Sequence, residues 1–300
     1  MADKTVKIIP PPDPNPVKPK YTPPPGACDA HCHVFGPGKR FPYAKDRAYE
    51  AHDAPKEALA ALHQHLGLQR AILVQASIHG TDNSALVDAL TTSKGAYRGV
   101  AMVAKNITQI DLQRLNAAGV RGVRYNFVKH LGGSTSREEV ESMILRIAPM
   151  GWHLELHLDA DNIVEMREFL RKLTIPFIID HMGRVQGRLG LEQPALRQLL
   201  ELLKDNPRAW VKISGAERVS AAGKPFTDAV PFAQALVKAA PDRVLWGTDW
   251  PHPNVKTMPN DGELVDLFAQ MVTDDATRQQ ILVENPTKLY WPETIRAPKK

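Results

Sequence analysis

Strand-like runs alternate with helix-like segments about eight times along this chain, and this alternation constrains its fold more than any other feature. The strand candidates occupy residues 27–35, 70–77, 97–104, 120–127, 152–159, 175–182, 209–216 and 243–250. Amphipathic helical spacing marks most intervening segments, for example residues 55–67, 111–119, 137–151, 162–173, 194–207 and 231–241. Repeated β–α alternation requires a parallel sheet, and eight units in roughly 250 residues are typical of an α/β fold of the closed (β/α)8 TIM-barrel type. A doubly wound open sheet is less favoured, because no Gly-x-Gly-x-x-Gly follows the first strand.

The barrel is expected to span residues 26–293 as one catalytic domain. Residues 1–25 are rich in proline, which lacks a backbone donor, so they predict an extended arm, and residues 294–300 predict a loose tail. The chain shows neither a signal-peptide pattern nor a run of about 18 apolar residues, so no membrane segment is expected. The two cysteines, Cys28 and Cys32, make no disulfide framework, which favours a cytoplasmic location.

The formal net charge of +5 is mild. The sequence has no lysine or arginine run on a helix and no nucleic-acid motif, so nucleic acid is not an expected partner. The positive excess is compatible with an ordinary basic surface or with a site that attracts an anionic substrate. A monomer or a small homo-oligomer is expected.

Alternation along the strands predicts which side chains face the barrel axis, because successive residues of a strand point to opposite faces. In the first strand Asp29, His31 and His33 share one face, whereas Cys28, Cys32 and the alanine between them share the other. The same rule turns further polar residues toward the axis: Gln75, Ser77, Arg124, Asn126, Glu155, His157 and Lys212.

Histidines and one aspartate follow four different strand candidates. His31 and His33 end the first, His157 the fifth, His181 the sixth and Asp249 the eighth. Active sites of (β/α)8 barrels lie at the carboxyl ends of the strands, so these five residues are expected to converge there. Imidazoles and a carboxylate in one place suit ester hydrolysis, because a base can activate water while donors stabilise the oxyanion.

Three motifs together resemble the amidohydrolase superfamily: DAHCHVFG at residues 29–36, DHMGR at 180–184 and WGTDWPHP at 246–253. With YTPPPGA, VQASIHGTDN, RGVRYNF and ENPTKLYW they look most like its lactone-hydrolysing branch, in particular the 2-pyrone-4,6-dicarboxylate hydrolases. That resemblance implies hydrolysis of the pyrone's ring ester to 4-oxalomesaconate, a tautomer of 4-carboxy-2-hydroxymuconate, in the protocatechuate 4,5-cleavage route of lignin-derived aromatics. It also implies catalytic roles: Asp249 as general base, and His31, His33 and His181 as groups that polarise the lactone carbonyl.

A substrate with two carboxylates calls for guanidinium groups in the pocket. By motif position, the resemblance implies these substrate-binding residues: Arg124, Arg184, Arg218, Ser77 and Tyr49. The sequence departs from the family where NFVKHL replaces NFLKRL, so that His130 stands in place of an arginine that grips a carboxylate.

The sequence alone does not decide whether the site binds a metal ion. The metal-free family pattern has a tyrosine where this chain has His157. His31, His33, His157 and Asp249 together fill the mononuclear pattern of other amidohydrolases, and such a set suits zinc. Both possibilities stay open: no cofactor, or one divalent metal with His181 beside it. Lys212 suggests either a Schiff base or an ion pair with Glu155.

The expected partner is a small anionic lactone. The same residues also leave room for another lactone, such as 4-sulfomuconolactone or a sugar-acid lactone, for a metal-dependent decarboxylase, and for a non-catalytic barrel.

Overall fold

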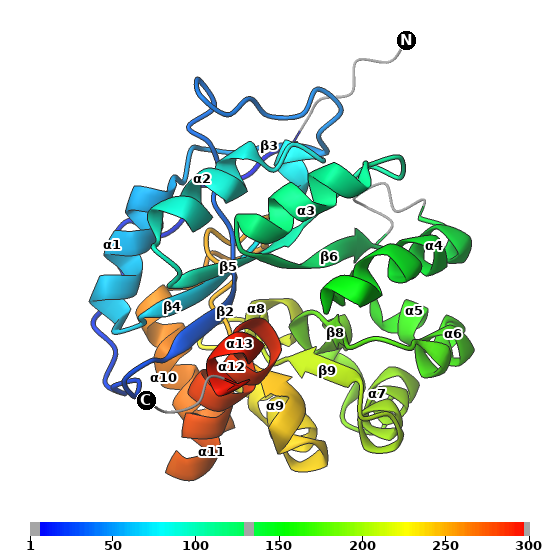
Figure 1. Cartoon of the computed structure of the whole chain (residues 1–300). Coiled ribbons are helices and arrows are strands. Elements are labelled where there is room, and N and C mark those ends of the chain that lie inside the picture. The colour runs from blue at the N-terminus through cyan, green and yellow to red at the C-terminus, as the bar shows by residue number, and fades with distance from the viewer. Residues whose placement is uncertain (1–6, 129–134, 297–300) are drawn as a thin grey trace.

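The computed structural model describes residues 7–128 and 135–296. Its main sheet contains eight parallel strands in the order β10-β9-β8-β7-β6-β5-β4-β2 (Figure 1). The strands are β2 (Cys28–Cys32), β4 (Arg70–Val74), β5 (Tyr97–Ala101), β6 (Val120–Asn126), β7 (His153–His157), β8 (Phe177–Ile179), β9 (Ala209–Lys212) and β10 (Val244–Leu245). Each falls within one of the eight predicted segments. Two short strands outside the barrel, β1 (Lys7–Ile8) and β3 (Tyr49–Glu50), pair with each other, and residues 9–27 contain no helix or strand.

Backbone hydrogen bonds join the two ends of the sheet. The chain that continues from β10 runs beside β2, where the Ala30 amide donates to the Trp246 carbonyl at 2.8 Å. Farther along, the Asp249 amide donates to the His31 carbonyl at 2.7 Å. The strands therefore form a (β/α)8 barrel, which confirms the predicted fold class.

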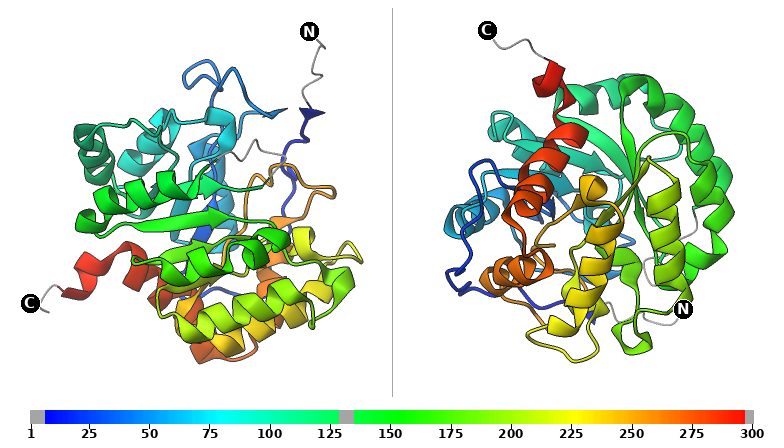
Figure 2. Two further views of the ribbon diagram at one scale, coloured as in Figure 1. Left: turned by 90° about the vertical axis from the view of Figure 1, so that its right-hand side faces the viewer. Right: turned by 90° about the horizontal axis from the view of Figure 1, so that it is seen from below.

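Helices surround the barrel (Figure 2). They are α1 (Lys56–Leu66), α2 (Ser84–Thr92), α3 (Gln109–Ala117), α4 (Arg137–Ile147), α5 (Ala160–Glu165), α6 (Arg167–Lys172), α7 (Pro194–Asp205), α8 (Ala216–Val219), α9 (Val230–Ala239), α10 (Asp261–Met271), α11 (Asp275–Gln279), α12 (Asn285–Tyr290) and α13 (Pro292–Arg296). The helix predicted over 162–173 is two helices, separated at Met166. None of the helices in the described residues is long and apolar enough to cross a bilayer.

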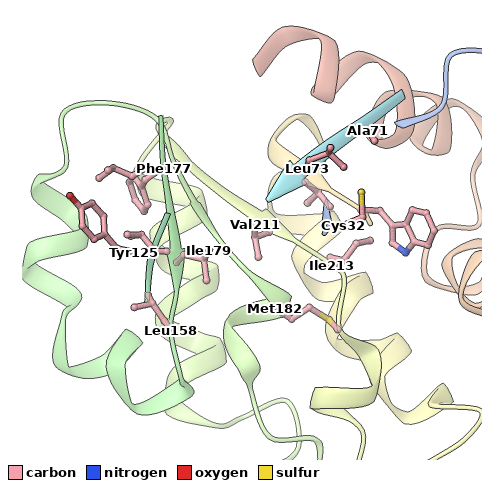
Figure 3. Packing of buried hydrophobic residues seen from close by; sticks show 14 of the residues in the cluster. Cys32, Ala71, Leu73, Tyr125, Leu158, Phe177, Ile179, Met182, Val211 and Ile213 are labelled. Atoms are coloured by element: carbon pink, nitrogen blue, oxygen red, sulfur yellow. The ribbon is translucent and has the colours of Figure 1, made fainter. Parts of the chain in front are cut away.

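The core has two apolar parts, one on each face of the strands. Between strands and helices lie residues such as Leu73, Phe177, Ile179 and Val211 (Figure 3). The alternate positions of the strands pack inside the barrel with the end of α12, and this inner cluster comprises Cys28, Ala30, Ile72, Val74, Val100, Ile178, Trp210, Leu245, Tyr290 and Trp291. Both faces of the strands are thus buried, as expected for a closed parallel barrel.

The predicted alternation is wrong at two places. The pairing of β2 with β4 shifts register between Asp29 and Cys32. Cys28 therefore lies in the inner cluster, while Asp29 faces α1 and its Oδ2 lies 3.2 Å from His63 Nε2. In β4 the inward residues are apolar, and the Gln75 amide instead donates to carbonyl groups of the following loop.

Gly247 sits where the barrel closes, so we expect Gly247→Ala to lower stability. An added Cβ would lie 2.9 Å from His31 Cα and 2.7 Å from Asp29 Oδ1, and the backbone of β2 cannot move without disturbing the closure. Overpacking of this kind costs about 1–3 kcal/mol or more. Chemical denaturation should show this loss relative to the wild-type protein, whereas Gly223→Ala reports only the strain of a side chain at φ +78°, because its Cβ would meet nothing within 4 Å. A Gly247→Ala variant as stable as the wild-type protein would contradict the close packing at Gly247.

Candidate active site

A cavity opens at the carboxyl ends of the strands. Its lining comprises His33, Tyr49, Ala76, Ser77, Arg124, His157, His181, Arg218, Asp249, Pro253 and Asn254. These residues come from β3, β6 and β7 and from the segments after β2, β4, β8, β9 and β10. The structure thus brings most of the predicted site residues to one place. His31 is buried directly beside the lining, with its Nε2 3.6 Å from Asp249 Oδ1.

Asp249 is held between imidazoles and a guanidinium. Its Oδ1 lies 3.2 Å from His33 Nε2 and 3.8 Å from His181 Nε2. Its Oδ2 accepts hydrogen bonds from Arg218 Nε at 3.1 Å and from Arg218 Nη2. Burial opposes ionisation of this carboxyl, but Arg218 holds the pKa of Asp249 well below its usual range. Asp249 is therefore an anion with one oxygen directed at the histidines.

The backbone is strained at the same place. Asp249 has φ +67° and His181 has φ +51°, in the left-handed region that non-glycine residues seldom adopt. The 2.7 Å hydrogen bond from the Asp249 amide to the His31 carbonyl fixes the first of these. Strain of this kind clusters at functional sites, and here it aims two side chains into the cavity.

Hydrogen bonds on Nδ1 orient three of the histidines. His33 Nδ1 donates to the Val74 carbonyl at 2.8 Å, and His181 Nδ1 lies 3.0 Å from the Ser214 hydroxyl. His157 Nδ1 lies 3.0 Å from Asn126 Oδ1. Burial lowers the pKa of His157 and His181 well below the usual value, so both rings are neutral. Each Nε2 is consequently free to interact with a group in the cavity.

A buried ion network lies on the inner side of His31. Lys212 donates to Glu155 Oε2 and lies 3.0 Å from His31 Nδ1 and 3.5 Å from Asp180 Oδ1. Arg124 donates to Asp180 Oδ2 through Nε at 3.1 Å and Nη2 at 3.0 Å. The structure therefore shows the ion pair of Lys212 with Glu155, and Lys212 does not line the cavity, so a Schiff-base role has no geometric support.

The expected substrate-binding residues differ in their placement. Arg124 and Arg218 line the cavity, each paired with an aspartate. Arg184 does not line it, because its Nε donates to Asp159 Oδ1 at 2.8 Å. His130 lies outside the described residues.

Two hydroxyl groups complete the cavity wall. Ser77 and Tyr49 both line it, as the resemblance implies. Burial raises the pKa of Tyr49 to about 12, so its phenol stays protonated and can donate a hydrogen bond.

A zinc site fits the residue types but not the ring protons. The ligand atoms of His31, His33 and Asp249 lie within 4.8 Å of one another, whereas His157 joins no such group in the part of the chain that the structure describes. An ammonium can only donate, so a hydrogen bond from Lys212 to His31 Nδ1, 3.0 Å away, would leave the ring proton of His31 on Nε2, which faces Asp249. In that tautomer Nε2 has no lone pair for a metal, so the set would not fit a zinc ion, and we derive no catalytic step through one.

Asp180 is a site residue that the sequence analysis did not single out. It follows β8 within the DHMGR motif, is fully buried, and pairs with Arg124 beside His31. Strand alternation from Ile178, an inward residue, was the available signal for it.

Comparisons with known proteins identify relatives of this chain. The sequence model of the amidohydrolase family matches residues 28–291. The chain is 45% identical over 290 residues to the 2-pyrone-4,6-dicarboxylate hydrolase of Comamonas testosteroni, covering 94% of this chain and 95% of that protein. It is 38% identical over 275 residues to the 4-sulfomuconolactone hydrolase of Hydrogenophaga intermedia, covering 90% of each. The fold matches that of a probable 2-pyrone-4,6-dicarboxylic acid hydrolase from Acinetobacter baumannii, solved with citric acid bound, with a TM-score of 0.78, 26% identity and coverage of 89% and 99%.

Proposed function

Because this chain belongs to the amidohydrolase family, we propose that it is a lactonase that hydrolyses the ring ester of 2-pyrone-4,6-dicarboxylate. One observation carries the proposal. An ionised carboxylate, Asp249, lies between Arg218 and the Nε2 atoms of three histidines, at a cavity that Arg124 also lines. A base, oxyanion donors and guanidinium groups are the components that hydrolysis of an anionic lactone requires.

Asp249 accepts the proton of the attacking water. As the water oxygen bonds to the ring carbonyl carbon, the carbonyl oxygen gains negative charge, and Asp249 Oδ1 takes the proton. The tetrahedral intermediate then collapses with cleavage of the ring C–O bond. The leaving enolate oxygen receives the proton that Asp249 carried, so that the net change is the addition of one water to give the enol 4-carboxy-2-hydroxymuconate, a tautomer of 4-oxalomesaconate.

The histidines stabilise the developing oxyanion. The hydrogen bond of Lys212 to His31 Nδ1 leaves a proton on His31 Nε2, which is directed toward the reacting groups. His181 presents Nε2 from a second side of Asp249. His33 donates from Nδ1 to the Val74 carbonyl, so it adds an oxyanion donor only in the form in which its Nε2, 3.2 Å from Asp249 Oδ1, also carries a proton. Preorganised donors in a buried site are worth roughly 100- to 1000-fold in rate, because they need no reorganisation during the reaction.

Guanidinium groups bind the carboxylates of the substrate. Arg124 Nη1 donates to none of the described residues, so it is available to a ligand at the cavity that Arg124 lines. The Acinetobacter baumannii relative has citric acid bound, a small polycarboxylate, and a dianionic pyrone has the same chemistry. Tyr49 and Ser77 supply hydroxyl donors beside them. These contacts favour a dicarboxylate over an uncharged lactone.

We expect turnover without a metal ion, since the proton on His31 Nε2 opposes a ligand role for that nitrogen. Treatment with a chelator should leave kcat unchanged, and elemental analysis should find far less than one zinc per chain. Loss of activity on chelation, restored by zinc, would contradict this.

Purified protein mixed with 2-pyrone-4,6-dicarboxylate tests the substrate. Ring opening should remove the ultraviolet absorbance of the pyrone, with a kcat/KM above those for 4-sulfomuconolactone and a sugar-acid lactone. 4-Sulfomuconolactone is the second candidate, because the Hydrogenophaga intermedia relative hydrolyses it. Turnover of that lactone with no change in the pyrone would overturn the proposed substrate but retain the reaction type. We expect the enzyme to act in the cytoplasm as a monomer or small homo-oligomer.

A further inference from the structure

One buried lysine outside the cavity lining contacts a histidine of the site. Lys212 is fully buried inside the barrel, and its Nζ lies 3.0 Å from His31 Nδ1. The other groups around this amine are the carboxylates of Glu155 and Asp180. Burial and the charge of Asp180 raise the pKa of Glu155 to about 7, whereas the pKa of Asp180 lies well below its usual range, so Asp180 is an anion beside the amine. An adjacent anion stabilises an ammonium, and in that form Lys212 carries donor protons and no lone pair.

We propose that Lys212 is a positioning residue that holds His31 in the tautomer with its ring proton on Nε2. A hydrogen bond on one ring nitrogen fixes which of the two carries the proton. Because Lys212 donates to Nδ1, the proton resides on Nε2, which lies 3.6 Å from Asp249 Oδ1. His31 is thereby a hydrogen-bond donor to the reacting oxygen and not a metal ligand.

Asp180 could have imposed the opposite tautomer. Its Oδ1 lies 3.3 Å from His31 Nδ1 and has no hydrogen-bond partner among the described residues. A carboxylate that accepts from Nδ1 leaves the Nε2 lone pair free, which is the usual arrangement behind a zinc-bound histidine. Lys212 lies closer to His31 Nδ1 than Asp180 does, at 3.0 Å, and donates to it in our proposal. The identity of one buried side chain therefore decides between an oxyanion donor and a zinc ligand.

The surrounding charges agree with a neutral ring. Burial and the adjacent Lys212 lower the pKa of His31 to about 3, so the imidazole is not protonated on both nitrogens near neutral pH. Arg124 balances Asp180 through two hydrogen bonds, and Lys212 balances Glu155. With both charge pairs satisfied, His31 needs no charge of its own.

The first test reads the tautomer in the wild-type enzyme. Long-range proton–nitrogen NMR at neutral pH, with the His31 signals identified by their absence in His31→Asn, should show a protonated Nε2 and an unprotonated Nδ1. A proton on Nδ1, or on both nitrogens, would overturn the proposal. This measurement needs neither a substrate nor a variant of Lys212.

The second test removes the lysine together with its counter-charge, in Lys212→Met/Glu155→Gln, so that no unpaired ion stays buried. His31 should then donate from Nδ1 to Asp180, and the affinity for added zinc should rise at least about tenfold in a competition with a chromophoric chelator. The kcat should fall by about 10- to 100-fold, with KM changed far less. Unchanged zinc affinity and tautomer in a folded variant would refute the role of Lys212.

A matched control carries the same two substitutions at a surface pair. Lys56 Nζ lies 3.0 Å from Glu57 Oε1, outside the cavity lining, and Lys56→Met/Glu57→Gln should change neither zinc affinity nor kcat. The kcat arm rests on the proposed function, whereas the tautomer and zinc arms do not. A wrong lactone would therefore leave those two results intact, so the two proposals can fail separately.

Discussion

Asp249→Asn is expected to lower kcat by about 100-fold or more, the range for removal of a general base. Asparagine has nearly the same shape, and its amide oxygen can still accept from Arg218. It cannot take a proton from water, because an amide is not a base near neutral pH. KM should change much less than kcat, since Arg124, Tyr49 and Ser77 still line the cavity.

A control variant and a measurement of stability are needed to interpret this result. Asp161→Asn, at an exposed position in the first turn of α5, should retain full activity and shows the effect of a neutral substitution. Thermal unfolding of both variants checks the fold, because Arg218 loses a charged partner when Asp249 is neutralised. A folded Asp249→Asn enzyme with wild-type turnover would remove Asp249 from the mechanism.

The barrel architecture could be predicted from the sequence because each strand and helix is marked by its own residues and the pattern recurs eight times. Each strand and most helices are readable from a few neighbouring residues, and eight repeats leave few topologies. The convergence of His33, His181 and Asp249 then follows, since the carboxyl ends of parallel strands share one end of the barrel.

Features that depend on pairing between distant segments escaped prediction. The register shift in β2 turns Asp29 outward. Residues 28–32 alone do not predict this shift, because it is defined relative to the neighbouring strand β4. Arg184 is drawn aside by Asp159, and Arg124 is held by Asp180. Such ion pairs join residues from different strand ends, so strand alternation gives the direction of each side chain but not its partner.

The position of the His31 ring proton could not be predicted from the sequence for the same reason, because it depends on the contact with Lys212. Alternation turns both residues inward, which the sequence permits one to infer. Whether the lysine meets a carboxylate alone, or a carboxylate and an imidazole, depends on distances across the barrel that only the structure supplies. The choice between a donor and a metal ligand at His31 depends on that difference.

Arg124→Met is expected to raise KM for a dicarboxylate lactone by about 30-fold or more, with a smaller effect on kcat. Arg124 is 5% exposed and lines the cavity, so an ion pair that it makes with the substrate is shielded from water. Loss of one partner of a buried charge pair costs about 2–5 kcal/mol, and each 1.4 kcal/mol is about tenfold in affinity. Steady-state kinetics with 2-pyrone-4,6-dicarboxylate should show the rise.

The alternative explanation is a damaged site, because Asp180 would lose the guanidinium that balances it. Arg124→Lys separates the two effects: a lysine keeps a cation opposite Asp180 but cannot donate to Asp180 and to the substrate with a planar fork. We therefore expect wild-type thermal stability and an intermediate KM for Arg124→Lys, and no change for Arg114→Met, whose side chain is 77% exposed. If Arg124→Met lowered kcat and left KM unchanged, Arg124 would serve the ion network around His31 and not the carboxylate of the substrate.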